Sequence, residues 1–314
     1  TAIERINEGC LCWVYIGHGH RHGLDRVRVP IGVARILDNR DVALVNSQAR
    51  MPIAVFLSCY TSAFDGDKPC LAENLLLKEG GPVAILGGSR VTMPYGMAVL
   101  SDAMMKELFQ SRRATIGEVL LAAKRRVALH DEDGLNRRLL NMLAKAISPN
   151  PDDLAGERNE HQLLFNLIGD PLLRIRHPLP VQVTTPALVA PGEPLVIQCE
   201  TKLKGDCLVE LACRRGALTF KNEPRHRFDG SHEGMRALSD VYQRANDDRF
   251  VHHKFRVKSS RFETTLTVPE NASGRCQIRV YVDGGASFAM GTSSLVVAQR
   301  SEPEPSSAEA VAGD

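Results

Sequence analysis

Hydrophobic residues in the first half of the chain fall into short runs separated by polar and glycine-rich segments. Residues 11–16 and 53–57 are apolar runs of the length expected for buried strands. Residues 71–77 form a helical pattern that ends before Gly80-Gly81, and residues 82–86 form another buried strand. This order predicts a βαβ unit within a parallel sheet.

Helical patterns continue from there to about residue 147. We expect helices over residues 97–109 and 135–147, and a third that begins at Thr115, where Glu118 completes a capping box. A short strand over residues 172–175 would then close one edge of the sheet. The first half of the chain is therefore predicted to be an α/β domain.

The pattern changes at His177-Pro178, beyond which short stretches alternate hydrophobic and polar residues. Pro, Gly and Asn separate these stretches, and a series of short strands with turn signals is typical of a β-sandwich. We therefore predict two domains, residues 1–178 and 179–300, of which the second is all-β. Its predicted strands are 181–185, 195–200, 207–213, 262–268, 276–282 and 293–298.

Two segments of the second half do not fit the strand pattern. Residues 214–261 contain twelve Lys or Arg against six Asp or Glu, which is typical of a solvated loop, with a basic protruding hairpin as the alternative. Residues 301–314 are rich in Ser, Glu, Ala and Pro, a composition that predicts a disordered tail.

The composition is that of an ordinary globular protein long enough for two cores. The chain has 314 residues and a formal charge of +2, from 39 Lys and Arg against 37 Asp and Glu. This balance gives no reason to expect a nucleic-acid partner. The apolar stretches are shorter than the roughly 18 residues that a membrane span needs, and no signal-peptide pattern opens the chain.

The eight cysteines form no regular disulfide framework; they stand at 10, 12, 59, 70, 199, 207, 213 and 276. Cys207 and Cys213 have even spacing within one predicted strand, so they share a face of it. They are core thiols or partners of Cys199 or Cys276, and the sequence does not choose between these states.

Two residues with chemical reactivity follow the first two predicted strands. His18 lies between Gly17 and Gly19, and Cys59 lies two residues beyond the second strand. If the strands are parallel neighbours, both side chains lie at the sheet edge where α/β proteins bind ligands. A cysteine nucleophile with a histidine base in reach is the arrangement of a cysteine peptidase. The backbone amides of Gly19 and Cys59 would form its oxyanion hole.

Other roles for these residues stay open from the sequence alone. A cysteine at a strand end is often a small core residue, and a histidine between glycines can cap a turn. His18, His20 and His22 stand at alternate positions, as in the ligand run of a zinc hydrolase, and Cys59 could then be a further ligand.

The order of these motifs resembles that of the gingipain-type cysteine peptidases, within the caspase-like clan. The resemblance covers about residues 8–177 and implies a caspase-like αβα sandwich followed by an immunoglobulin-like β-sandwich. It also implies a His18–Cys59 dyad and an oxyanion hole formed by the amides of Gly19 and Cys59. It rests on Gly17-His18-Gly19, the run from Phe56 to Asp65, Leu71-Ala72-Glu73, the run from Gly81 to Gly87, and the run from Leu167 to Pro171.

The resemblance carries further expectations. Met93 and Tyr95 fall where the wall of the specificity pocket lies, with a packed loop as the alternative. Substrates would be proteins or peptides, and the protein would be secreted or on the cell surface. No cofactor is required, although some relatives bind calcium, for which Asp65 and Asp67 could supply oxygen ligands.

The chain also departs from the family pattern. His20 stands where a small hydroxyl residue is expected, and the strands that precede the histidine strand in such a sheet are missing from residues 1–178. The missing strands favour a second kind of function, in which a degenerate caspase-like domain presents the β-sandwich as a non-catalytic surface or adaptor protein. Intact His18 and Cys59 argue against that alternative.

Overall fold

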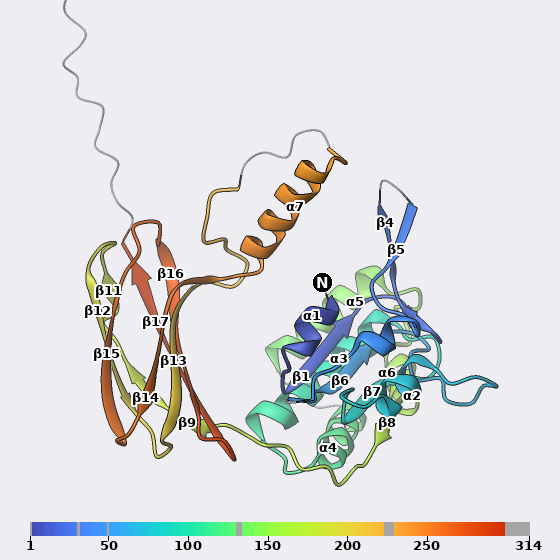
Figure 1. The fold of residues 1–314 in the computed structure, drawn as a ribbon. Coiled ribbons are helices and arrows are strands. Elements are labelled where there is room, and N and C mark those ends of the chain that lie inside the picture. The colour runs from blue at the N-terminus through green and yellow to red at the C-terminus, as the bar shows by residue number, and fades with distance from the viewer. Residues whose placement is uncertain (1, 30–31, 49, 130–133, 223–228, 299–314) are drawn as a thin grey trace, which may run out of the picture. The chain divides into compact units, whose positions relative to one another are not determined.

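The computed structural model describes residues 2–29, 32–48, 50–129, 134–222 and 229–298. The chain divides into two compact units, Thr1–Ile175 and Arg176–Asp314 (Figure 1). Each unit has its own buried hydrophobic residues. None of the helices among the described residues has the length and apolarity needed to cross a membrane. The tail predicted over residues 301–314 lies outside the described residues.

A four-stranded sheet forms the centre of the first unit, in the order β1-β6-β7-β8. The strand pairs β1·β6 and β6·β7 are parallel, whereas β8 is antiparallel to β7. The two strands that precede His18 and Cys59 are therefore parallel neighbours, which confirms that part of the prediction. The strands of the sheet are β1 (Cys12–Ile16), β6 (Ile53–Leu57), β7 (Ala84–Gly88) and β8 (Phe165–Gly169). Two small hairpins follow β1: β2 (Gly19–His20) pairs with β3 (Gly23–Leu24), and β4 (Arg26–Val29) pairs with β5 (Gly32–Arg35).

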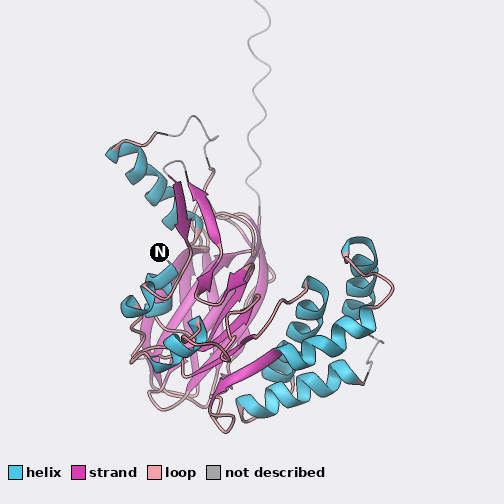
Figure 2. Cartoon of the chain, turned by 90° about the vertical axis from the view of Figure 1, so that its right-hand side faces the viewer, coloured by secondary structure: helices cyan, strands magenta, loops and turns pink. Residues whose placement is uncertain are grey.

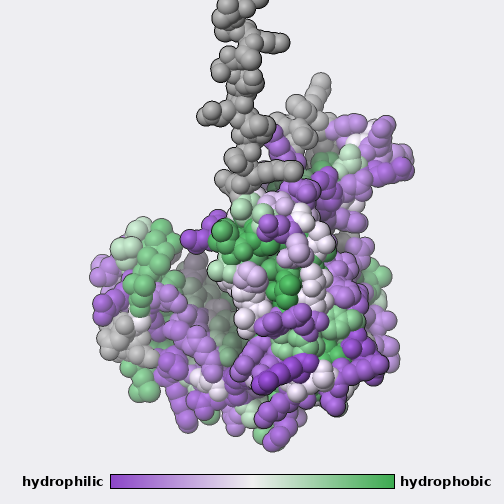
Figure 3. All heavy atoms as spheres, turned by 90° about the vertical axis from the view of Figure 1, so that its left-hand side faces the viewer, coloured by the Kyte–Doolittle hydropathy of each residue, from purple (hydrophilic) through white to green (hydrophobic). Residues whose placement is uncertain are grey.

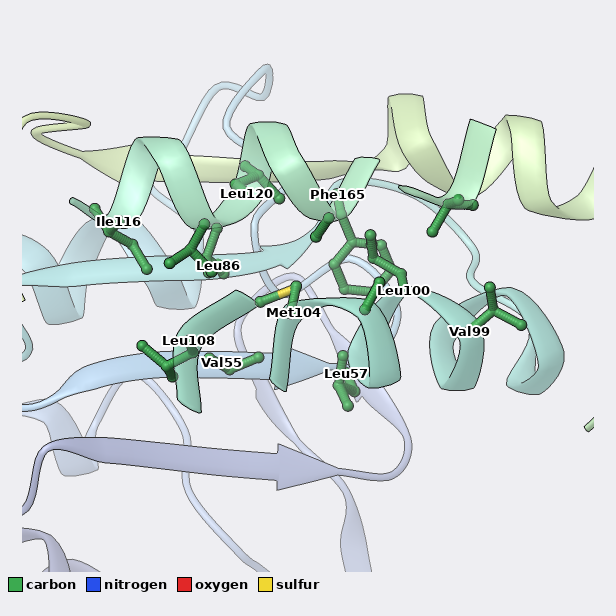
Figure 4. Packing of buried hydrophobic residues seen from close by; sticks show 14 of the residues in the cluster. Val55, Leu57, Leu86, Val99, Leu100, Met104, Leu108, Ile116, Leu120 and Phe165 are labelled. Atoms are coloured by element: carbon green, nitrogen blue, oxygen red, sulfur yellow. The ribbon is translucent and has the colours of Figure 1, made fainter. Parts of the chain in front are cut away.

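Helices pack on both faces of this sheet, and its two interior strands β6 and β7 are therefore buried at every position. Val55 and Leu57 lie in the core that α3, α4 and α6 cover, as Figure 4 shows. Phe56 points to the opposite face, where α1 and α2 supply the neighbours. A strand buried on both faces is typical of an α/β sheet. The helices are α1 (Ala2–Asn7), α2 (Leu71–Leu77), α3 (Pro94–Met105), α4 (Ile116–Ala128), α5 (Leu135–Ile147) and α6 (Leu154–Leu164).

The predicted helices of the first unit are present. The helix expected over residues 97–109 is α3 together with the π-helical turn Lys106–Gln110 that extends it. Thr115 caps α4, since its Oγ1 accepts a hydrogen bond from the Glu118 amide at 3.3 Å and the Glu118 carboxylate accepts one from the Thr115 amide. This is the capping box that the sequence predicts.

The closing strand predicted over residues 172–175 is wrong. The last strand of the sheet is β8, which directly follows α6. Within residues 172–175, Arg174 forms an isolated β-bridge with Thr115. Gly169 has a φ of 136°, and Pro171 has no amide hydrogen to donate to a ladder, so the chain turns away from β7 after β8.

The second unit consists of two sheets whose buried residues form one core. Along β12, exposed and buried residues alternate strictly, as expected for a sheet with one face on the core. Hydrophilic residues cover most of the face seen in Figure 3, with smaller apolar patches between them. One sheet contains β10 (Gln182–Thr184), β12 (Pro194–Glu200) and β15 (Arg261–Thr267); the other contains β9 (Leu179–Pro180), β11 (Leu188–Val189), β13 (Gly205–Cys213), β14 (Arg249–Val257), β16 (Gly274–Asp283) and β17 (Phe288–Val297).

The solvated loop predicted over residues 214–261 is wrong for most of its length. It contains α7 (His232–Ala245), the one helix among the described residues of the second unit (Figure 2). It also contains β14, which pairs with β13 along its whole length. No residue of α7 is buried, but Met235, Leu238 and Val241 recur in it at helical spacing, a signal that the prediction from charge did not weigh. In β14, several charged side chains interrupt the apolar alternation that identifies a strand.

A buried carboxylate in the first unit offers a test of its stability. The Glu107 side chain is buried and accepts hydrogen bonds from Arg113 Nε at 2.8 Å and from Arg126 Nη2 at 2.6 Å. The hydrogen bond from Arg113, followed by that from Arg126, holds the pKa of Glu107 below its ordinary value of 4.5, although burial opposes this shift.

We expect Glu107→Gln to lower the free energy of unfolding by about 1–2 kcal/mol near neutral pH, because charge-assisted hydrogen bonds become neutral ones. A carboxyl with a depressed folded pKa stabilises the fold above its unfolded value of 4.5 and loses that contribution as the pH falls through the folded pKa. The difference between wild type and variant should therefore shrink in acid. Denaturant unfolding at several pH values measures it, with the exposed Glu79→Gln as control. A stability difference between wild type and Glu107→Gln that does not change with pH would contradict the lowered pKa of Glu107.

Candidate active site

The carboxyl ends of β1 and β6 bring the segments of His18 and Cys59 together. The pairing continues beyond the strands, since the amide of Gly17 donates to the Leu57 carbonyl at 3.3 Å. A Cβ atom on Gly19 would lie 2.8 Å from the Cys59 carbonyl oxygen, so the turn around His18 touches the Cys59 loop. His18 is exposed and Cys59 is half-buried. Both predicted residues therefore lie at one open edge of the sheet.

Tyr15 supports the turn that carries His18. Its hydroxyl donates to the His18 carbonyl oxygen at 2.8 Å and accepts from the Asp25 amide at 3.3 Å. Burial raises the pKa of Tyr15, so the hydroxyl stays protonated and remains a donor. A Cβ atom on Gly17 would lie 2.7 Å from this hydroxyl, which explains the glycine at that position.

The backbone is strained immediately after Cys59. Tyr60 has a φ of 56°, in the left-handed region that residues other than glycine rarely adopt. Hydrogen bonds hold this conformation, because the Tyr60 amide donates to the Arg90 carbonyl at 3.1 Å and the Ser62 amide donates to the Gly88 carbonyl at 3.0 Å. Strain of this kind persists where surrounding contacts enforce it and clusters at functional sites.

Thr92 contacts the Cys59 sulfur, a role that sequence reasoning missed. The Thr92 backbone N–H donates to Cys59 Sγ at 3.3 Å, and the Thr92 hydroxyl oxygen lies 3.6 Å from the same sulfur. Thr92 is buried, so it holds the sulfur from the protein side. A backbone N–H in this position can donate a hydrogen bond to the thiolate form of Cys59.

Helix α6 fixes the chain just after Thr92. His161 is 1% exposed, and its Nε2 accepts a hydrogen bond from the Met93 amide at 2.7 Å. Its Nδ1 lies 2.7 Å from the Glu157 carbonyl oxygen, so the ring proton belongs on Nδ1. The Glu157 carboxylate accepts from the Gly96 amide at 2.8 Å. Glu157 and His161 are one helical turn apart, and this spacing was the sequence signal that could have revealed them.

The two residues predicted to line a pocket lie in different surroundings. Met93 is half-buried and precedes α3 as its N-cap residue. Tyr95 is 6% exposed, and its hydroxyl donates to Asn141 Oδ1 and accepts from Arg158 Nη1, both at 2.7 Å. These contacts favour the packed-loop alternative for Tyr95, whereas the pocket role of Met93 stays a prediction.

His20 and His22 are engaged with their own loop. His20 Nδ1 accepts from the His22 amide at 3.3 Å, and His22 Nδ1 lies 3.3 Å from Asn39 Nδ2. Burial, followed by the charges of Arg26 and Arg35, lowers the pKa of His20. Across the part of the chain that the structure describes, no three His, Cys, Asp or Glu side chains gather as metal ligands. The zinc alternative therefore lacks a ligand set here.

The model of peptidase family C25, the gingipain family of cysteine peptidases, matches residues 1–176, more than half of the chain. The chain belongs to peptidase family C25. The match contains the ends of β1 and β6, and it confirms the resemblance that the motifs indicated. No curated protein sequence matches this chain.

Several solved structures are similar to this C25 chain. For gingipain R (RGPB), described as an Arg-specific cysteine proteinase, the identity is 16% with a TM-score of 0.41, over 94% of this chain and 55% of that one. For the complex of Porphyromonas gingivalis RgpB pro- and mature domains, the identity is 16% with a TM-score of 0.40, over 94% of this chain and 56% of that one. Salmonella alpha-2-macroglobulin reacted with methylamine matches at 15% identity and a TM-score of 0.26, over 43% of this chain and 10% of that one. The C25 chain thus spans about half the length of the two gingipain chains.

Asp65 is paired within the C25 domain. Its carboxylate binds the Arg90 guanidinium, which joins the loop after Cys59 to the segment before Thr92. The hydrogen bond from Arg90 lowers the pKa of Asp65. Calcium binding by Asp65 and Asp67 stays a prediction, and it would compete with this ion pair.

The contact between Gly19 and the Cys59 loop predicts the effect of adding one methyl group. In Gly19→Ala, the new Cβ would lie 2.8 Å from both the Cys59 carbonyl oxygen and Thr61 Cγ2, so the turn must move away. We expect a loss of about 1–3 kcal/mol in the free energy of unfolding. Glu160→Ala is the control, because Glu160 is exposed in the interior of α6, where alanine suits a helix. Equal stability of the two variants, measured by denaturant unfolding, would contradict the contact.

Proposed function

We propose that this chain is a cysteine endopeptidase that uses Cys59 as nucleophile and His18 as general acid and base. The observation that carries the proposal is the contact of the His18 turn with the Cys59 loop at the carboxyl edge of two parallel strands. Membership of a cysteine peptidase family supports the same chemistry. The exposure of His18 and the half-buried Cys59 leave the pair open to a peptide.

In the proposed mechanism, His18 takes the thiol proton and Cys59 Sγ attacks the carbonyl carbon of the scissile bond. The amides of Gly19 and Cys59 stabilise the oxyanion that forms. His18 then protonates the amine that leaves, and a thioacyl-enzyme remains. Water attacks this thioester, with His18 as base, which releases the acid product and restores the thiol.

Thr92 has a positioning role in this proposal. Its N–H reaches Cys59 Sγ from the protein side, and α6 fixes the following residue through His161. The sulfur is therefore held at a defined place before substrate arrives. Such preorganisation is how an enzyme keeps a nucleophile within reach of a carbonyl carbon.

The fold assignments form part of the same proposal. The first unit, with helices on both faces of its sheet, would have the caspase-like αβα arrangement, and the second unit would be an immunoglobulin-like β-sandwich. Substrates would be proteins or peptides. Met93 is the residue of the predicted pocket wall whose exposure suits contact with substrate.

Substitution of the two reactive residues tests the proposal. We expect Cys59→Ala and His18→Ala each to lower the rate of peptide cleavage by roughly 10³-fold or more, since each removes a group from the covalent step. Cys12→Ala and His22→Ala are matched controls on the neighbouring segments and should retain activity. Cleavage of a peptide library, followed by mass spectrometry, measures the rates and the residue preference together.

Two results would overturn the assignment. Cleavage that persists in Cys59→Ala would remove the nucleophile from the mechanism. Cleavage that a zinc chelator abolishes and added zinc restores would favour the metallohydrolase alternative. Labelling of wild type by a thiol-directed peptide probe, absent in Cys59→Ala, supports the proposal independently of turnover.

A further inference from the structure

Cys213 and Cys276 stand opposite each other in the second unit. Cys213 is the last residue of β13, and its Cα partner on the antiparallel strand β16 is Cys276. Directly opposite residues of an antiparallel pair have their side chains on the same face of the sheet. Both cysteines are buried, at 5% and 4% exposure, so that face is the core side.

The hydrogen-bond pattern shows which kind of antiparallel pair these cysteines form. The Arg214 amide donates to the Arg275 carbonyl at 3.1 Å, so the next pair along the ladder is hydrogen-bonded. The Cys213 amide donates to the other side, to the Asp248 carbonyl at 2.8 Å. Since hydrogen-bonded and non-hydrogen-bonded pairs alternate, Cys213 and Cys276 form a non-hydrogen-bonded pair.

This kind of pair suits a covalent bond between the side chains. The Cα atoms of a non-hydrogen-bonded pair lie about 4.5 Å apart, with their side chains closer than in the other kind of pair. Disulfides join residues whose Cα atoms lie roughly 4.4–6.8 Å apart. Cys199 and Cys207 have no such register, because they lie on β12 and β13, in different sheets.

We propose that Cys213 and Cys276 are a modification site, at which a disulfide bond joins β13 to β16 when the chain folds in an oxidising environment. The bond would close a loop of residues 214–275, which contains α7, β14 and β15. It would therefore fasten two neighbouring strands that the chain connects through elements of both sheets. This inference does not depend on the peptidase activity proposed for the first unit.

The bond forms by exchange with a small disulfide such as oxidised glutathione. One cysteine thiolate attacks the glutathione disulfide and releases one glutathione thiolate; the second cysteine then attacks the mixed disulfide and releases the other. One S–S bond breaks and one forms, and the two cysteine protons pass to the two glutathione thiolates. Two electrons thus move from the protein to glutathione.

Burial decides when this exchange happens. It raises the pKa of Cys213 and raises that of Cys276 to about 11, so both thiols are unreactive once the sheet has formed. The exchange therefore belongs to folding, before β13 and β16 close over the sulfurs. Once formed, the bond should resist reduction until the second unit unfolds.

Peptide mapping tests the pairing directly. The full chain is refolded in a buffer of reduced and oxidised glutathione, its free thiols are alkylated, and the digest is analysed without reductant. We expect a linked peptide pair that contains Cys213 and Cys276, with Cys59 alkylated. Alkylation of both Cys213 and Cys276, or their linkage to Cys199 or Cys207, would overturn the proposal.

Stability measurements provide a second test. Protein refolded with the glutathione pair should have a higher thermal unfolding midpoint than protein refolded with excess reductant, because the cross-link restricts the unfolded chain. Cys213→Ala and Cys276→Ala should both lose that difference, whereas Cys10→Ala should keep it. If wild type, Cys213→Ala, Cys276→Ala and Cys10→Ala all showed the same difference in midpoint between the two refolding conditions, the proposal would be contradicted. If either core variant fails to fold, the peptide map of the wild-type chain decides.

Discussion

The parallel pairing of β1 with β6 is the constraint on which the candidate site depends. Ile16 lies level with Leu57, so the two strands end together and their next residues, with His18 and Cys59 among them, emerge at one edge. β6 is apolar on both faces, so it takes an interior place with a paired strand on each side and helices above and below. Burial of a five-residue strand thus positions two residues that are 41 positions apart.

The supports of the site come from elements distant in sequence. Tyr15 and the glycines beside His18 shape the histidine turn, whereas Thr92 holds the sulfur and α6 holds the chain after Thr92. His161 and Glu157 also accept amide hydrogens at the start of α3. One helix therefore completes the hydrogen bonding of another and aligns the segment that faces the sulfur. Buried polar groups that are satisfied in this way keep a site rigid.

The second unit is organised by a simpler rule, the alternation of buried and exposed residues along antiparallel strands. This rule places Cys207, Cys213 and Cys276 on the core side. Only the register between strands then distinguishes among them, because it sets Cys213 against Cys276 and leaves Cys207 opposite Val282. Side-chain chemistry in this unit is decided by which residues stand opposite one another.

The amino-acid sequence by itself determined the elements with strong local signals: the apolar strands β6 and β7, the capped helix α4 and the alternating strands of the second unit. It also indicated that the segments of His18 and Cys59 meet at one edge of the sheet. It did not reveal β8 as the closing strand or β14, because their places depend on pairing with β7 and β13. It did not reveal α7 either, although Met235, Leu238 and Val241 recur there at helical spacing. Only the tertiary structure decided that Tyr95 is packed and that Thr92 contacts the Cys59 sulfur. It also decided that His161 binds the chain directly after Thr92. Those roles arise from contacts between residues that are 33 to 68 positions apart, and no local periodicity records such contacts.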